Sequence, residues 1–148
     1  MRTFLLAVLT LMLSPISAIS KEHDYAVGQV WEFASDAQTS VPLLRIQEIA
    51  SFDSGGNSSE VFHISVIDVD LAGDGTFITL VEHLPVSRQT LDASVTRLSD
   101  RSAAFPDYRS GMEQWRAANG GVFTITMSEI IAILRQSVRR MDQPSPNK

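Results

Sequence analysis

The sequence predicts an α+β domain, a mostly antiparallel sheet of about five strands with two or three helices packed on one face. Three observations lead to this fold class. Segments rich in β-branched residues alternate with short turn sequences through the first part of the chain. Apolar residues recur at helical spacing in the last third. The chain has 148 residues and no cysteine, so one core has to hold the fold without disulfides.

Residues 1–18 have the three-part layout of a secretory signal peptide. Arg2 supplies the positive charge, residues 4–13 are apolar, and small residues lead to Ala18, after which we expect cleavage. The apolar run is too short to span a bilayer, which takes about 20 residues. The expected location is therefore periplasmic or secreted, with no membrane insertion after cleavage.

Residues 19–148 are predicted to form one exported domain, with residues 141–148 as a disordered tail. The chain holds 12 basic and 17 acidic residues, a net charge of −5, and loss of Arg2 makes that charge more negative by one. Such an acidic balance disfavours nucleic acid and anionic lipid as partners. The lack of cysteine excludes disulfides, thiolate metal sites and thiol catalysis.

The first elements are short strands. Residues 19–26 are polar and expected to be frayed, and Gly28–Phe33 alternates as a first strand does. Leu43–Phe52 fits helix or strand by pattern. We favour a strand because Pro42 precedes it and a hairpin follows. Asp53–Ser59 is rich in glycine and serine and is expected to be a mobile loop.

The middle of the chain is predicted to form a β-hairpin. Val61–Val69 and Phe77–Leu84 are rich in β-branched residues, and residues 70–75 between them hold the glycines and aspartates of a turn. A turn symmetric about Gly73 pairs Phe62 with Leu84. One face of the hairpin is then aliphatic and faces the core, interrupted by Glu82. The residues predicted for that face are Phe62, Ile64, Val66, Ile78, Leu80 and Leu84.

In the same register His63 lies directly opposite His83 on the other face, with Cβ atoms roughly 4.5–5.5 Å apart. Two neutral imidazoles suit zinc, copper or nickel, but a metal site needs a third ligand. His23 lies in the frayed start and Glu82 points to the other face. Three interpretations stay open: a metal site, a ligand-contact role and, favoured over both, two half-buried histidines that each hydrogen-bond to the backbone or to a neighbouring helix.

A first helix is expected after this hairpin. Pro85 is predicted to close the second arm, and Ser87 is a good N-cap. Leu91, Val95 and Leu98 recur at i, i+4 and i+7, which predicts a helix that ends near Leu98.

The C-terminal part begins with a loop, residues 99–106. Tyr108, Met112 and Trp115 then have helical spacing, and the glycines at 120 and 121 form a stop signal. Val122–Met127 is predicted as a fifth strand with mixed connectivity, because helices intervene before it.

A last helix, Glu129–Arg140, is predicted with Thr126 or Ser128 as its cap. Its apolar stripe is the set Ile130, Ile131, Leu134 and Val138.

Four stretches carry a resemblance to a known family: residues 28–31, residues 61–66, His83–Ser87 with the residues after it, and residues 108–125 with Trp115-Arg116 among them. In these stretches the chain resembles a family of small uncharacterised bacterial proteins, a domain of unknown function. The resemblance covers nearly all of residues 19–148. It implies a bacterial origin and a compact single domain, and it implies no activity, substrate or catalytic residue.

Aromatic side chains supply further candidates for recognition. Trp31, Tyr108 and Trp115 suit a binding surface because aromatic residues dominate binding hot spots, although a role in the core is favoured for them. Arg116, beside Trp115, is a candidate for contact with an acidic partner, with a solvated arginine as the favoured alternative.

No motif of a known catalytic class is present. The stretch from Asp68 to Thr79 begins like a calcium loop but lacks ligands at positions five and twelve. Asp53-Ser54-Gly55-Gly56 resembles part of a serine-protease loop, without the fold that this loop requires.

We therefore predict a non-enzymatic exported protein, without a cofactor, that binds a protein partner in the cell envelope, as inhibitor or immunity proteins do. The alternative is an enzyme, or a domain that binds a small molecule or metal, with the His63/His83 face as its site.

Overall fold

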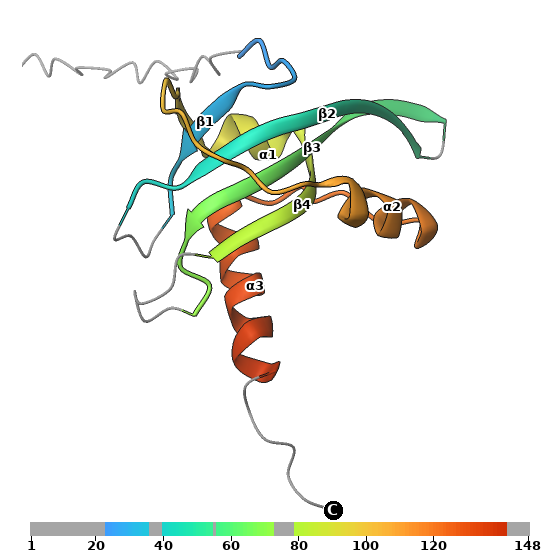
Figure 1. Ribbon diagram of the computed structural model, residues 1–148. Coiled ribbons are helices and arrows are strands. Elements are labelled where there is room, and N and C mark those ends of the chain that lie inside the picture. Colours follow the sequence, from blue (N-terminus) through green and yellow to red (C-terminus); the bar gives the residue numbers. More distant parts are fainter. Residues whose placement is uncertain (1–22, 36–39, 55, 73–78, 142–148) are drawn as a thin grey trace, which may run out of the picture.

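The structure is a computed structural model that describes residues 23–35, 40–54, 56–72 and 79–141 (Figure 1). The elements in chain order are β1 (Val30–Phe33), β2 (Leu43–Ser54), β3 (Asn57–Val69), β4 (Thr79–Ser87), α1 (Arg88–Ser94), β5 (Val95–Leu98), α2 (Arg109–Ala117) and α3 (Met127–Met141). The five strands form one antiparallel sheet of order β4-β3-β2-β1-β5. The predicted α+β fold class is confirmed.

The main core lies between one face of the sheet and the helices α1 and α3. In β3, Phe62, Ile64 and Val66 point to this face because successive side chains in a strand alternate between faces. α1 contributes Leu91, and α3 contributes the predicted stripe, of which Ile130 and Ile131 are fully buried. Burial of these aliphatic side chains is the main stabilising term of the fold.

The opposite face of the sheet is covered by α2 and by residues 99–108. Figure 1 shows this segment crossing in front of the sheet while α1 and α3 lie behind it. Val61, His63 and Ser65 of β3 are buried on this side, and Met112 of α2 is 2% exposed. The sheet is therefore covered on both faces, which explains why β3 carries buried residues at consecutive positions.

The β3–β4 hairpin forms as predicted, but with a different register. Ile64 pairs with Leu84 and His63 with Pro85, so the direct pairing of His63 with His83 is wrong. The register then shifts by a bulge, and Val66 pairs with Val81. An extra residue on one strand reverses the alternation beyond it.

The bulge changes which residues of β4 face the core. Leu84 and Val81 pack against the core, whereas Leu80, predicted to be buried, is 49% exposed. Glu82 is exposed as well. Ile78 and residues 73–75 of the predicted turn lie outside the described residues.

The predicted loop over Asp53–Ser59 is wrong. β2 and β3 stay paired to the end of the hairpin, where Ser54 faces Asn57. Gly56 has a φ of 88°, a left-handed conformation that glycine adopts without strain. A tight turn therefore replaces the loop and makes this hairpin the longest in the sheet.

Two predicted boundaries around α1 are also wrong. β4 continues through Pro85 to Ser87, which proline allows on an edge strand because no neighbouring strand needs its N–H there. Ser87 caps α1 as predicted, its hydroxyl accepting a hydrogen bond from the Thr90 N–H.

The helix then ends at Ser94, not near Leu98. Val95–Leu98 instead forms β5 on the far edge of the sheet. Buried Glu32 of β1 holds Arg97 there, with the Arg97 Nε 2.8 Å from the carboxylate. Pairing with β1 thus overrides a helical pattern of only three residues.

The predicted strand over Val122–Met127 is absent from the sheet. Only Phe123 touches a strand, as an isolated parallel bridge to Val86. The sheet itself holds no parallel pair among the described residues, so the predicted mixed connectivity is wrong as well.

The last two helices and the start of the described chain complete the fold. α2 and α3 agree with the prediction, and Thr126 caps α3. Tyr25, predicted to be frayed, is 9% exposed and packs edge-on against Trp31 and Phe62. The predicted signal peptide and residues 142–148 of the tail lie outside the described residues. No helix in the described part of the chain is long and apolar enough to cross a membrane.

Candidate functional site

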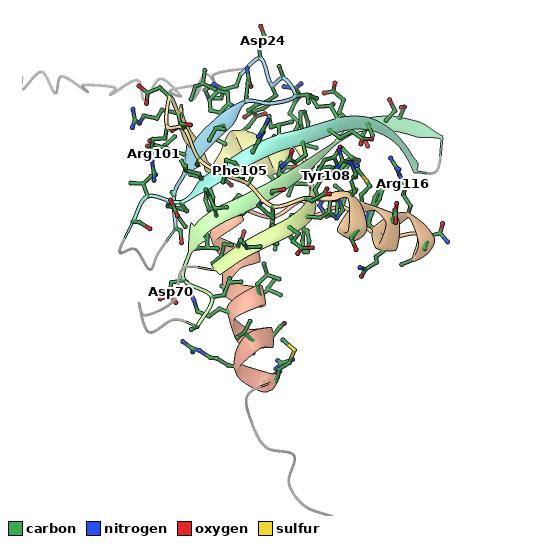
Figure 2. The ribbon with its side chains drawn as sticks, viewed as in Figure 1. Asp24, Asp70, Arg101, Phe105, Tyr108 and Arg116 are labelled. Carbon is green, nitrogen blue, oxygen red and sulfur yellow. The ribbon has the colours of Figure 1, made fainter. Side chains whose placement is uncertain are left out.

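Most of the candidate residues from the sequence gather around α2. The residues that the structure brings together there are His63, His83, Tyr108, Trp115 and Arg116. Figure 2 shows Phe105 and Tyr108 on the segment that crosses this face and Arg116 beyond them on α2. Trp31 is not part of the group, because it is 5% exposed in the core on the other face.

His63 and His83 lie on the same face of the sheet and contact each other. His63 Nδ1 is 2.8 Å from His83 Nε2, and the two rings are stacked with centroids 5.1 Å apart. A nitrogen–nitrogen distance of this length is a hydrogen bond, with one imidazole donating and the other accepting. The sharing of one face was predicted. In the structure His83 lies two residues from Pro85, the residue that pairs with His63, so strand alternation places both histidines on one face.

α2 covers this histidine pair. The indole ring of Trp115 meets the His63 ring edge-to-face at 4.9 Å. Gly111 lies so close to the sheet that a Cβ atom at its position would be 2.6 Å from the Cβ of His83. Glycine is therefore required at this point of the helix for the close approach.

Burial keeps both imidazoles neutral. Burial, followed by the neighbouring His83 and Arg116, lowers the pKa of His63 to about 4. Burial followed by Arg116 also lowers the pKa of His83, against an opposing effect of Glu48. Since charging either ring is unfavourable here, both rings are neutral at neutral pH, and an N–H of one ring lies between His63 Nδ1 and His83 Nε2.

This geometry gives the pair a structural role. His63 is 0% exposed, so a ligand cannot reach it in this structure. Its Nε2 has no hydrogen-bond partner among the described residues. No group of three or more His, Asp or Glu side chains in the described part of the chain could hold a metal ion. The observed contacts dock α2 onto the sheet.

Two hollows flank α2. The smaller, about 220 Å³, is lined mostly by charged side chains: Glu48, Tyr108, Arg109, Met112, Glu113 and Arg116. Two of these side chains already form an ion pair across it, because Arg116 is 3.1 Å from Glu48. The guanidinium proposed for an acidic partner is thus already paired within the chain.

The larger hollow is a groove of about 440 Å³ at the outer edge of β4. Residues 80–83 of β4 form its base. α2 contributes Gly111 and Gln114 to the lining, and the C-terminal half of α3 forms the remaining wall. Its apolar lining residues are Leu71, Leu80, Val81, Leu134, Val138 and Met141. Glu82 is the single charged residue in the lining among the described residues.

The groove was not predicted from the sequence. The strand pattern predicts Leu80 in the core, and the bulge that turns this residue outward has no signal in the residue pattern. The sequence predicts Met141 as the first residue of the disordered tail, whereas it is the last residue of α3. Leu134 and Val138, predicted as part of the buried stripe of the last helix, are only half-buried and line the groove.

Comparisons of this chain with protein-family models, with curated proteins and with solved structures found no match. The predicted resemblance to a family of bacterial proteins stays a prediction.

Proposed function

We propose that this is an exported, non-enzymatic protein that binds a protein partner in the groove between β4, α2 and α3. The observation that carries the proposal is the apolar surface that this groove leaves open to solvent. Leu80 is 49% and Met141 77% exposed, and they adjoin half-buried Leu134 and Val138. Contiguous apolar surface beside polar residues is typical of a site that binds another molecule.

The location of the histidine pair also supports binding over catalysis. Acid–base catalysis needs a titratable side chain within hydrogen-bond reach of a substrate. His63 is buried beneath α2, and His83 presents only part of its ring to the groove. Their hydrogen bond instead fixes the wall of the groove that α2 provides.

Charge indicates the kind of partner. The chain has a net charge of −5, and the groove carries the exposed carboxylate of Glu82. Complementary charge raises the rate of association, so a basic target protein fits best. An inhibitor or immunity protein that blocks such a target is the class that agrees with these features.

A matched pair of substitutions tests the proposal. Leu80→Arg places a charge in the groove, whereas Ile133→Arg changes a residue of α3 that is equally exposed at 47% but lies outside the groove. Tagged wild-type protein and the Ile133→Arg variant should capture the same stoichiometric partner from an envelope extract of native cells. Leu80→Arg should lose it. A partner that all three capture equally would contradict the proposal.

A further inference from the structure

We propose that the groove takes an extended segment of the partner, apolar with basic residues, which adds to the outer edge of β4 as a new strand. This inference rests on the proposed function and names the chemistry of its partner. It follows from the backbone of β4, the walls of the groove and the charge of its lining.

The outer edge of β4 offers main-chain groups for pairing. β4 is the last strand of the sheet, and the described residues place no strand beyond it. Near its C-terminal end, Phe123 already uses this edge. The Ser87 N–H donates to the Phe123 carbonyl at 2.9 Å, and the Phe123 N–H donates to the Pro85 carbonyl at 2.9 Å. The same edge continues past the bulge toward residue 80 and forms the base of the groove, where the Glu82 carbonyl already accepts from the Ser65 hydroxyl at 2.6 Å.

The walls of the groove match a strand in that position. Side chains of a strand alternate between the two faces of its sheet. On one face an added strand would meet α3, where Leu134 and Val138 continue the core. On the other it would meet α2 at Gly111 and Gln114, beside His83. Alternating apolar and polar side chains therefore suit this groove.

Charge selects among the possible occupants. Glu82 is exposed, and no Lys or Arg of the described residues lines the groove, so Lys or Arg on the partner segment complements its charge. A second copy of this chain is disfavoured at this edge. Antiparallel pairing of two β4 edges about the groove would bring the two Glu82 carboxylates together, and like charges on neighbouring strands are unfavourable.

Synthetic peptides test the inference directly. The probes are a fluorescent decapeptide of alternating valine and lysine, its counterpart with glutamate in place of lysine, and a lysine peptide N-methylated at two adjacent central residues. Adjacent N–H groups point to opposite edges of a strand, so this methylation blocks both edges. Fluorescence anisotropy gives the affinity of each peptide for the wild-type protein.

We expect the lysine peptide to bind and the methylated one to bind about tenfold more weakly, because main-chain hydrogen bonds are lost. Glu82→Lys should weaken the lysine peptide about fivefold and strengthen the glutamate peptide. Glu113→Lys, an exposed residue of α2 outside the groove, should leave both affinities unchanged.

Equal binding of the methylated peptide, or no binding of any peptide, would overturn strand addition while leaving the proposed function standing. The proposed function fails separately, if capture of the native partner does not depend on Leu80.

Discussion

At the scale of single residues, the hydrogen bond between His63 and His83 is the contact that fixes the surface around α2. It joins two strands, and the Trp115 ring and the backbone at Gly111 close over it. A buried neutral pair of this kind stabilises only while both rings stay uncharged.

The stability of the protein should fall with acid in a way that depends on His63. Above pH 6.5 the ring is neutral in the folded and the unfolded chain, so its contribution is fully present. Between pH 6.5 and about 4 the unfolded chain takes up a proton that the folded chain does not, and the contribution is lost. We expect a decrease of about 2–3 kcal/mol in unfolding free energy between pH 7.5 and 4.5 from this group.

Urea denaturation of the wild-type protein and of His63→Leu over this pH range measures that decrease. Carboxylates titrate in both proteins, so the difference between the two isolates the histidine. The stability advantage of the wild type should shrink as the pH falls. An advantage that is constant with pH would refute the buried neutral state.

Gly111→Ala should destabilise the protein although alanine favours helix. The new Cβ atom would lie 2.6 Å from the His83 Cβ, which is attached to the backbone of β4 and cannot move aside as the end of a flexible side chain can. We expect overpacking to cost about 1–3 kcal/mol against a gain of about 1 kcal/mol in helix propensity. Thermal unfolding checks this, with Gly121→Ala as control, because nothing lies within 4 Å of a Cβ there. Equal melting temperatures for the two variants would show that α2 sits higher above the sheet.

At the scale of elements, α3 is held by a capping box. The Thr126 hydroxyl accepts from the Glu129 N–H, and the Glu129 carboxylate accepts from the Thr126 N–H at 2.8 Å. Two backbone donors at the start of the helix are thereby satisfied. The wall of the groove depends on this helix, because Leu134, Val138 and Met141 all follow the cap.

Thr126→Ala should therefore lower the unfolding free energy by about 1 kcal/mol. Thr124→Ala, at an exposed position two residues earlier, should change it by less than about 0.5 kcal/mol. Chemical denaturation of both variants provides the comparison. A loss of equal size at Thr124 would mean that the cap adds nothing specific.

The elements also show which sequence patterns predict secondary structure correctly. The long patterns predicted the right type of element: the apolar stripe of α3, the strand pattern of β2 and the two hairpin arms that became β3 and β4. Val95–Leu98 was read as helix because three apolar residues fit that spacing, and only pairing with β1 decides otherwise. Asp53 and Ser54 extend β2 into the predicted loop for the same reason, because they pair with Ser58 and Asn57 of β3. Short segments follow their neighbours more than their own propensity.

At the scale of the whole molecule, the sequence predicted the fold class but not where the chain leaves a surface open. The placement of both histidines on one face of the sheet was predictable from strand periodicity. The bulge beside His83 was not, because a bulge leaves no composition signal. That one irregularity turns Leu80 outward and creates the base of the groove. The residue pattern also did not indicate that both faces of the sheet are covered, one by α1 and α3 and the other by α2 with residues 99–108.

The central claim is that the edge of β4 between α2 and α3 is where this protein binds. Amide hydrogen exchange with and without the alternating valine–lysine peptide tests it most directly. The account predicts new protection at the amides of residues 80–83, and none around Glu48 and Arg109 at the other hollow. Protection at that charged hollow, with residues 80–83 exchanging as before, would contradict it.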